Sequence, residues 1–394
     1  MPIAWRETHR PHANFKGEIV MMTKNVMRLA ATGLASWLCA APAMATGWTL
    51  TDLGTLGGTN SAANGINNAG QVVGYAEAAD GTPYPVIWSG GVASALGTRP
   101  GRAVALGANG VAAGNVMSVD GQQLDATLLS GGNAYDLGTF GGSFSLVQAV
   151  NDSGLVAGYA RTPDEKDHAF LATASGTVDL GTFGGLYSYV YGLNQSGLAV
   201  GSAYDASGTA RCFRTTGGGL VDLGTFGGRF CNAFAVNDAG QITGGAATSA
   251  GVAHAFVFDS RGLIDLGTLG GTSSVGNAIN RLGQVVGVAR TSTNQQHAFL
   301  HDGTRMIDLG TLGGTTSSAT GVNASGQVVG NATLASGSRQ PFFFANGVML
   351  NVNTLAPGLS DVDASHLYLN DAGQIGGTGT IVGKQRAFVL TPTP

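Results

Sequence analysis

Asp308-Leu309-Gly310-Thr311-Leu312-Gly313-Gly314 is one of six intact copies of the stretch Asp-Leu-Gly-Thr-(Leu/Phe)-Gly-Gly. The intact copies begin at Asp52, Asp136, Asp179, Asp222, Asp265 and Asp308, and two worn copies begin at Ala95 and Asn351. Six of the seven steps between consecutive copies are 43 residues long and the other is 41. A fixed period of about 20 to 50 residues indicates a repeat architecture.

Short apolar runs and turn signals alternate between the copies. In the first repeat the runs cover residues 62–66, 71–76 and 84–88, and none has the period of an amphipathic helix. An Asn-x-x-Gly signal, Asn67 to Gly70 here, separates the first two runs. Asn bonds the backbone two residues on and Gly accepts a positive φ, so this signal predicts a tight hairpin.

Each repeat therefore predicts four short strands, which is typical of a β-propeller blade. One strand, residues 48–53, precedes the first Gly-rich stretch, and three strands follow the last one, around residues 366–370, 374–378 and 386–390. One plus three completes a blade. We predict an all-β propeller of eight four-stranded blades whose N-terminal strand closes the last blade. The rival fold, an open β-solenoid, needs capping elements that the sequence does not offer.

The first 45 residues differ from the repeats. We interpret residues 1–45 as an upstream segment followed by a secretory signal peptide, with the true start at Met21 or Met22 and cleavage near Ala45. Residues 46–394 then form one propeller domain, which we expect to be secreted or periplasmic.

Charge and hydropathy exclude two classes of partner. Removing residues 1–45 takes away five of the 19 basic and two of the 23 acidic residues, so the net charge changes from −4 to −7. An acidic protein lacks the basic face that nucleic acid requires. No later stretch approaches the roughly 20 apolar residues of a membrane span. We expect a monomer with no cofactor.

A second motif begins the third strand of several repeats. The triplet His-Ala-Phe stands at residues 168–170, 254–256 and 297–299, and related triplets stand at 211–213, 340–342 and 386–388. Together with the Gly-rich stretch, these triplets make the chain resemble the bacterial HAF-repeat family of extracellular repeat proteins. The resemblance implies an exported, propeller-like repeat protein and supplies no catalytic residues.

The repeated Asp and His residues have two interpretations. The six Asp residues could form a cation or glycan rim, or each could accept hydrogen bonds from its own Gly-rich loop. One carboxylate per blade does not supply the six to eight oxygen ligands of calcium, so we favour the second interpretation and predict no metal site. His168, His254 and His297 occupy one position in different blades, so we expect local partners for them rather than a shared ion.

Residues that depart from the repeat are the candidates for a site. Phe144, Tyr187, Tyr189 and Phe230 follow the Gly pair in three consecutive repeats, and they could stack on a sugar or partner, or pack between blades. The charged run at residues 164–167 is typical of a solvated loop.

Two further pairs also depart from the repeat. Asp361 and Asp363 form a close acidic pair that could serve acid–base chemistry on a glycoside, or be a polar insertion. Cys212 and Cys231 replace small residues of adjoining blades, and either a disulfide or two buried thiols would fit.

These observations predict a non-catalytic binding or scaffold module for extracellular or cell-surface polysaccharide or protein. The first alternative is a carbohydrate-active hydrolase or lyase on a propeller scaffold. The second is a purely structural envelope or matrix component.

Overall fold

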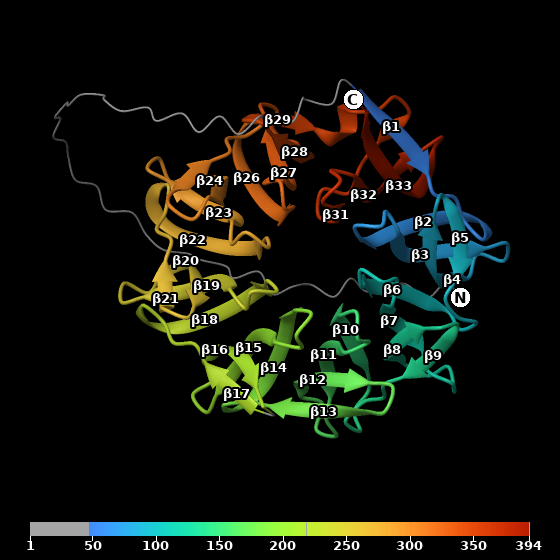
Figure 1. Cartoon of the computed structure of the whole chain (residues 1–394), viewed down its shortest axis with the longest axis horizontal. Helices are drawn as coiled ribbons and strands as arrows, with labels where there is room; N and C mark the ends of the chain where they lie inside the picture. The colour runs from blue at the N-terminus through green and yellow to red at the C-terminus, as the bar shows by residue number, and fades with distance from the viewer. Residues whose placement is uncertain (1–46, 218, 394) are drawn as a thin grey trace. The chain divides into compact units, whose positions relative to one another are not determined.

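The computed structural model describes residues 47–217 and 219–393, which form eight antiparallel sheets in a ring (Figure 1). Seven sheets have four strands, and the eighth carries one additional two-residue strand. The predicted eight-bladed all-β propeller is therefore confirmed. The signal-peptide interpretation concerns residues 1–45, which lie outside the described residues.

The blades follow one another along the chain, and the first strand of each lies innermost. Blade 1 is β2 (Gly57–Ile66), β3 (Val72–Ala78), β4 (Pro83–Ser89) and β5 (Val92–Ala95), and blade 2 is β6 (Gly101–Leu106), β7 (Ala112–Met117), β8 (Leu124–Ser130) and β9 (Asn133–Asp136). Blade 3 is β10 (Ser145–Val150), β11 (Val156–Arg161), β12 (Asp167–Thr173) and β13 (Gly176–Gly181), and blade 4 is β14 (Gly184–Leu193), β15 (Ala199–Asp205), β16 (Ala210–Thr216) and β17 (Gly219–Asp222).

The remaining blades repeat this order. Blade 5 is β18 (Gly227–Val236), β19 (Ile242–Thr248), β20 (Ala253–Asp259) and β21 (Gly262–Asp265), and blade 6 is β22 (Gly270–Ile279), β23 (Val285–Thr291), β24 (Gln296–His301) and β25 (Met306–Asp308). Blade 7 is β26 (Gly313–Val322), β27 (Val328–Leu334), β28 (Arg339–Ala345) and β29 (Val348–Asn351). Blade 8 comprises β31 (Leu367–Leu369), β32 (Ile375–Ile381), β33 (Lys384–Thr393) and β1 (Gly47–Asp52), with β30 (Leu359–Ser360) also paired to β32 and preceded by the 3-10 turn η1 (Val352–Thr354).

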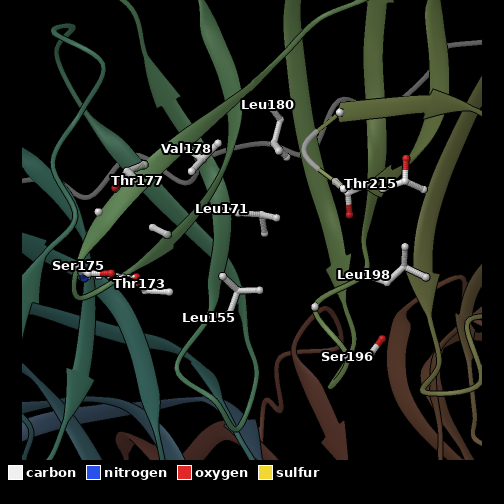
Figure 2. A pocket seen from close by; sticks show the side chains of 16 residues that line it. Leu155, Leu171, Thr173, Ser175, Thr177, Val178, Leu180, Ser196, Leu198 and Thr215 are labelled. Atoms are coloured by element: carbon white, nitrogen blue, oxygen red, sulfur yellow. Dashed lines mark hydrogen bonds between the residues drawn. The ribbon is translucent and has the colours of Figure 1, made fainter.

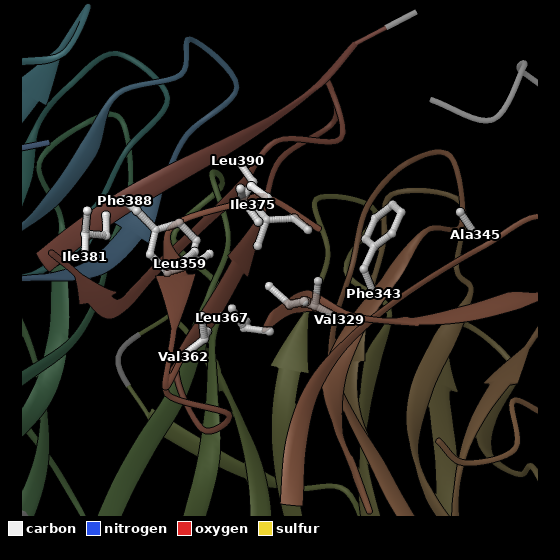
Figure 3. Close-up of a cluster of buried hydrophobic side chains, with 12 residues drawn as sticks. Val329, Phe343, Ala345, Leu359, Val362, Leu367, Ile375, Ile381, Phe388 and Leu390 are labelled. Atoms are coloured by element: carbon white, nitrogen blue, oxygen red, sulfur yellow. The ribbon is translucent and has the colours of Figure 1, made fainter. Parts of the chain in front are cut away.

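The N-terminal strand closes the ring, as predicted. β1 pairs with β33 over its whole length, from Gly47 opposite Thr393 to Asp52 opposite Phe388. Trp48 on β1 packs edge-on against Phe343 of blade 7, with ring centroids 5.2 Å apart. Figure 3 shows the buried cluster that Phe343 shares with side chains of blade 8 such as Phe388. The closing strand is thus held by both a hydrogen-bonded ladder and an apolar core.

Antiparallel pairing places the connections on two opposite faces of the propeller. The Gly-rich stretches, which lead from one blade to the next, share a face with the turns between second and third strands; we call this the loop face. The Asn-x-x-Gly turns share the other face with the turns between third and fourth strands; we call this the turn face.

The three residues of the His-Ala-Phe triplet have different roles in the structure. In blade 3, Phe170 is fully buried between blades, and the equivalent phenylalanines of blades 4 to 8 are also fully buried. The backbone N–H of Ala169 donates to Ser188 Oγ of the next blade at 2.8 Å. Four other blade junctions use the same serine–amide bond, accepted by Ser61, Ser145, Ser274 and Ser317.

Cys212 and Cys231 form a disulfide, with their Cα atoms 4.8 Å apart. Cys212 occupies the alanine position of the triplet in blade 4, and Cys231 occupies the serine position in blade 5. The disulfide therefore stands where other junctions have the serine–amide bond, and it links two neighbouring blades covalently.

A ring of asparagines links the blades on the turn face. The Asn67 side chain folds its own turn, since its Oδ1 accepts from the N–H groups of Ala69 and Gln71. Its Nδ2 donates to a carbonyl of the next blade, and six more asparagines do the same: Asn151, Asn194, Asn237, Asn280, Asn323 and Asn370. The Asn370 bond, at 3.1 Å, crosses from blade 8 to the carbonyl of Asn67 in blade 1. Blade 2 has Gly107 in this place, and Asn109 with Asp152 of blade 3 completes the ring.

Within the described residues, none of the helical segments has the length and apolar character needed to cross a membrane.

Candidate functional site

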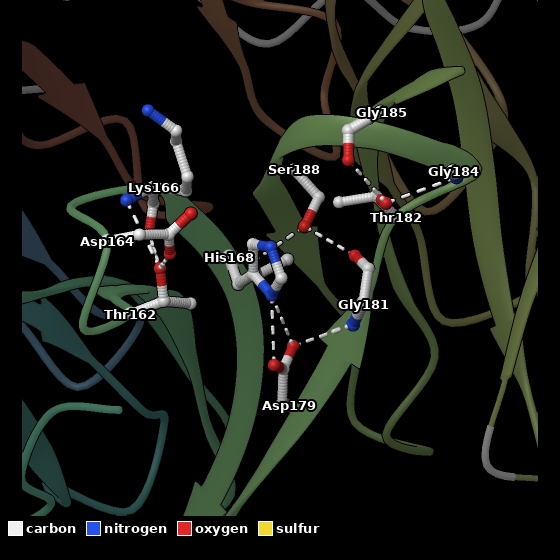
Figure 4. A network of polar contacts seen from close by, with 11 residues as sticks. Thr162, Asp164, Lys166, His168, Asp179, Gly181, Thr182, Gly184, Gly185 and Ser188 are labelled. Atoms are coloured by element: carbon white, nitrogen blue, oxygen red, sulfur yellow. Dashed lines mark hydrogen bonds and ion pairs between the residues drawn. The ribbon is translucent and has the colours of Figure 1, made fainter. Parts of the chain in front are cut away.

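The repeated aspartates fold their own loops. Asp179 Oδ1 accepts from the N–H of Gly181 at 2.7 Å, and Thr182 Oγ1 donates to the carbonyl of Gly185 at 2.9 Å (Figure 4). The other intact Gly-rich stretches repeat the aspartate bond at 2.7 to 2.9 Å. These hydrogen bonds confirm the interpretation of the aspartates as turn residues. Within the described residues no three His, Cys, Asp or Glu side chains gather as a metal site.

The histidines of the triplets pair with these aspartates. His168 Nδ1 lies 2.9 Å from Asp179 Oδ2, and His254 and His297 make the equivalent contacts with Asp265 and Asp308. The nearby Ser188 is buried, and its hydroxyl donates to the Gly181 carbonyl at 2.6 Å while accepting from Ala169. The single proton of the Ser188 hydroxyl is donated to the Gly181 carbonyl and not to His168. Asp, His and Ser therefore do not form a catalytic triad here.

The structure gives Asp361 and Asp363 separate partners. Asp363 Oδ2 lies 2.6 Å from His366 Nδ1, and Asp363 Oδ1 accepts from the N–H of Ser365. Asp361 accepts from Ser360 Oγ at 3.0 Å. The hydrogen bond from His366 holds the pKa of Asp363 below its ordinary value. Asp363 is therefore ionised at neutral pH, which suits an ion pair or a base and not a proton donor.

An aromatic and charged group lies on the loop face where blade 3 meets blade 4. Phe144 contacts Tyr159 edge-on at 6.3 Å between centroids, and Tyr159 contacts Tyr189 of blade 4 at 5.2 Å. The guanidinium of Arg161 lies over the Phe144 ring, 4.3 Å from its centroid. Three of these rings are half-buried and come from two blades, so they form one continuous surface.

Asp167 is the polar centre of this group. Its Oδ1 accepts from Arg161 Nε at 3.2 Å, and its Oδ2 accepts from the Tyr189 hydroxyl at 3.1 Å. Arg161 also pairs with Glu165 at 2.6 Å. Only 17% of the Asp167 side chain is exposed, so the carboxylate depends on these donors.

A second pair of rings adjoins the first. Tyr187 contacts Tyr204 at 6.0 Å between centroids, and Lys166 Nζ of blade 3 lies 5.9 Å from the centroid of Tyr187. We define the loop-face cluster as these residues together: Phe144, Tyr159, Arg161, Glu165, Lys166, Asp167, Tyr187, Tyr189 and Tyr204. Phe230 lies in blade 5, one blade away. The cluster thus unites three of the four predicted aromatic residues.

The cluster continues along the innermost strands of blades 4 and 5. Tyr189 stacks on Tyr191 at 6.5 Å, and Tyr191 contacts Phe234 of blade 5 at 5.5 Å. Tyr191 and Phe234 lie at β-bulges of the innermost strands, where the pairing register shifts. The same bulge recurs in the innermost strands of five other blades, so it belongs to the repeat. The two aromatic rings extend the surface from blade 4 to blade 5.

Burial changes the acidity of the two central tyrosines. Burial, and secondarily the charge of Asp167, raises the pKa of Tyr159 to about 12. Burial also raises the pKa of Tyr189, and the charge and hydrogen bond of Asp167 raise it further. Both hydroxyls therefore keep their protons at neutral pH, beside a carboxylate.

The contacts of the charged residues 164–167 were not predicted from the sequence. We interpreted residues 164–167 as a solvated loop, whereas Lys166 and Asp167 contact the aromatic residues of blade 4. A signal was present, because Glu165 stands in the turn where blades 1, 2, 4, 5 and 7 have Gly81, Gly121, Gly208, Gly251 and Gly337. Glu165 adopts a left-handed φ of 59°. Such strain in a non-glycine residue is concentrated at functional sites.

Comparison with known proteins yields structural neighbours only, since no protein-family model and no curated protein matches this chain. A Mycobacterium tuberculosis puromycin-hydrolysing peptidase is 12% identical, with 87% of this chain and 61% of that one covered and a TM-score of 0.48. The β-propeller domain of the Trilobed protease from Pyrococcus furiosus is 11% identical, with 75% and 98% covered and a TM-score of 0.48. A TolB from Agrobacterium tumefaciens is 14% identical, with 55% and 83% covered and a TM-score of 0.38.

These neighbours correct the functional prediction. We predicted a non-catalytic binding or scaffold module, and that prediction is wrong on this comparison, because peptidases recur among the neighbours and agree better with the hydrolase alternative. This chain spans about three fifths of the puromycin-hydrolysing peptidase. At these identities and TM-scores the likeness assigns no activity to this chain.

Proposed function

We infer that the protein is a carbohydrate-active hydrolase or lyase, and that the loop-face cluster is its active site. The observation that carries this proposal is the arrangement around Asp167, where one carboxylate lies between the Arg161 guanidinium and the protonated Tyr189 hydroxyl. Proton donor, proton acceptor and cation are thus within one group.

The chemistry of either reaction needs these three groups. In glycoside hydrolysis an acid protonates the leaving oxygen while a carboxylate activates water or attacks the sugar. In β-elimination a base removes a proton next to a carboxyl group, and a nearby cation stabilises the negative charge that develops. Asp167 would accept a proton, and Tyr189 would pass its own proton to the leaving oxygen while taking the proton from Asp167, so that no tyrosinate forms. Lys166 would face the negative charge.

The aromatic surface supports a sugar as the substrate. Sugar rings have an apolar face, which packs on aromatic side chains, and hydroxyls, which bond polar groups at the ring edges. Phe144, Tyr159, Tyr187 and Tyr189 present aromatic surface on both sides of Asp167. The signal-like residues 1–45 favour export, so we propose an extracellular or periplasmic polysaccharide as the substrate.

A polysaccharide panel tests this proposal. The purified protein is incubated with neutral and uronate-containing polysaccharides, and new reducing ends and the ultraviolet absorbance of unsaturated products are measured in the same samples. We expect new ends with at least one polysaccharide, and the absorbance distinguishes a lyase from a hydrolase. Absence of new ends across the panel would reject the proposal.

Two variants assign the activity to the cluster. D167N and Y189F each remove one proton-transfer group, and we expect each to lower kcat at least about 100-fold, as loss of a general acid or base does. D205N is the matched control, because Asp205 is a loop-face carboxylate of the next blade whose bonds go to its own turn. Equal losses in D205N and D167N would contradict the assignment.

A further inference from the structure

A pocket of about 680 Å³ lies on the turn face between blades 3 and 4. Figure 2 shows Leu155 and Leu171 of blade 3 on one side, and Leu198 and Thr215 of blade 4 on the other. Its walls are mainly leucines, and its rim carries hydroxyls, among them those of Thr173 and Ser196. None of the lining residues is charged. The volume lies within the range of small-molecule sites, about 300 to 1,000 Å³.

One repeat position explains why the pocket is at this junction. It is the residue two places after the phenylalanine of the triplet. Six blades carry a large side chain there: Trp88, Leu129, Phe258, His301, Phe344 and Leu390. Blade 4 carries the small residue Thr215 instead, and Thr215 lines the pocket. Blade 3 carries Ala172, but its side chain packs with Ala126 and Leu128 of the preceding blade, so this replacement opens no space here. The space therefore results from the large-to-small replacement at Thr215.

A second repeat position makes the pocket apolar. The residue after the Asn-x-x-Gly turn is glutamine in five blades, where its Oε1 accepts from the turn asparagine: Gln71, Gln241, Gln284, Gln327 and Gln374. In blades 3 and 4 it is Leu155 and Leu198, which cannot accept that bond. Each replacement gives up a side-chain hydrogen bond and adds an apolar wall to the pocket.

Blade 2 provides an internal comparison. It also lacks the glutamine, having Val111, but it keeps the large Leu129 at the first position. The pocket lined by Val111 and Leu129 is only about 250 Å³. An apolar replacement alone therefore leaves a small pocket, and the small residue Thr215, in the place of Leu129, accounts for the larger one.

We propose that this pocket binds an uncharged, largely apolar small molecule that contains a ring system. The side chain missing at position 215 is of the size of Trp, Phe or Leu, so the space fits a ring-sized apolar group. A neutral lining disfavours charged ligands, because burying a charge without a partner is costly. The rim hydroxyls supply hydrogen bonds for one polar end. The site is on the opposite face from the loop-face cluster and does not depend on its activity.

Nile red, an uncharged dye with fused rings, tests the pocket by fluorescence titration. We expect saturable binding to the full chain and weaker binding of the anionic dye anilinonaphthalene sulfonate. T215F introduces the residue of blade 5, T215L that of blade 2, and L155Q the residue of five blades. Because other blades accommodate these residues, we expect each variant to keep its Tm while its Kd for Nile red rises at least about tenfold, or 1.4 kcal/mol.

V111Q is the matched control, since it makes the same apolar-to-glutamine change outside the large pocket, and it should bind Nile red like the parent protein. Where one variant lowers the Tm, the others decide the outcome. Absence of saturable Nile red binding would overturn the proposal. Unchanged binding in T215F, T215L and L155Q would also overturn it, as would equal binding of the anionic dye.

Discussion

At the scale of single residues, two turns keep a strained backbone for different reasons. Glu165 and Val382 are non-glycine residues with φ of 59° and 49°, in turns that join second and third strands. The Glu165 carboxylate bonds Arg161 and Ser143, so its strain is tied to the loop-face cluster. Val382 is 92% exposed. A β-branched residue in the left-handed region is a genuine outlier, and little contact offsets its strain.

We therefore expect V382G to stabilise the protein by about 1 kcal/mol, because glycine adopts this backbone conformation without the steric cost of a Cβ atom. Chemical denaturation of the two proteins measures the difference. V119G is the control, since Val119 is 85% exposed but lies outside the left-handed region. A lower denaturation midpoint for V382G than for the parent would contradict the expectation.

At the scale of strands, one junction shows two solutions to the same contact. The third strand of a blade meets the first strand of the next through a serine–amide bond at five junctions, and through the disulfide of Cys212 and Cys231 at another. The two cysteines are 19 residues apart. A disulfide restricts the unfolded chain by an amount that depends on the number of residues it encloses.

Two double variants separate the contribution of the disulfide to stability from that of the serine–amide bond. We expect C212A/C231S to lose about 3 kcal/mol of stability through the missing link. C212A/C231A should lose about 1 kcal/mol more, because the amide of residue 212 then has no hydroxyl acceptor. Equilibrium unfolding under non-reducing conditions gives both differences. Equal stability of the two double variants would show that the serine–amide bond contributes nothing.

How much the sequence predicts depends on how far apart the interacting residues are. The Asp179 loop and the Asn67 turn are built from neighbours in the chain, so their residue types were sufficient to predict them. The 43-residue period was sufficient to predict the blades. The strand that contains Trp48 was sufficient to predict the closure of the ring. The contact of Asp167 with Tyr189 joins residues of different blades, and no local pattern predicts it. The disulfide likewise required the 4.8 Å separation of two Cα atoms.

At the scale of the whole molecule, stability depends on closure. β1 contributes six register pairs to β33 and places Trp48 against Phe343. Without β1, the ten residues of β33 would become an unpaired edge, and the apolar cluster of blades 7 and 8 would open on one side. Unpaired edges also promote association between molecules.

Deleting residues 47–53 should therefore lower the stability by at least about 3 kcal/mol, the usual cost of losing one large buried aromatic residue. Thermal unfolding measures the loss, and light scattering detects association through the exposed edge. A synthetic peptide of residues 47–53 should restore part of the lost Tm. An unchanged melting curve would contradict the role of β1 in closure.

The asparagine ring has a consequence for how such a chain lengthens. Each asparagine bonds only to the blade that follows it, and the bond from Asn370 to Asn67 obeys the same local rule as the others. A gene duplication or deletion of one unit that carries this asparagine would leave its neighbours able to make the same bond. The asparagine ring therefore sets no limit of its own on the number of blades. Blade 2, with Gly107 in place of asparagine, is the unit whose loss would restore a uniform ring.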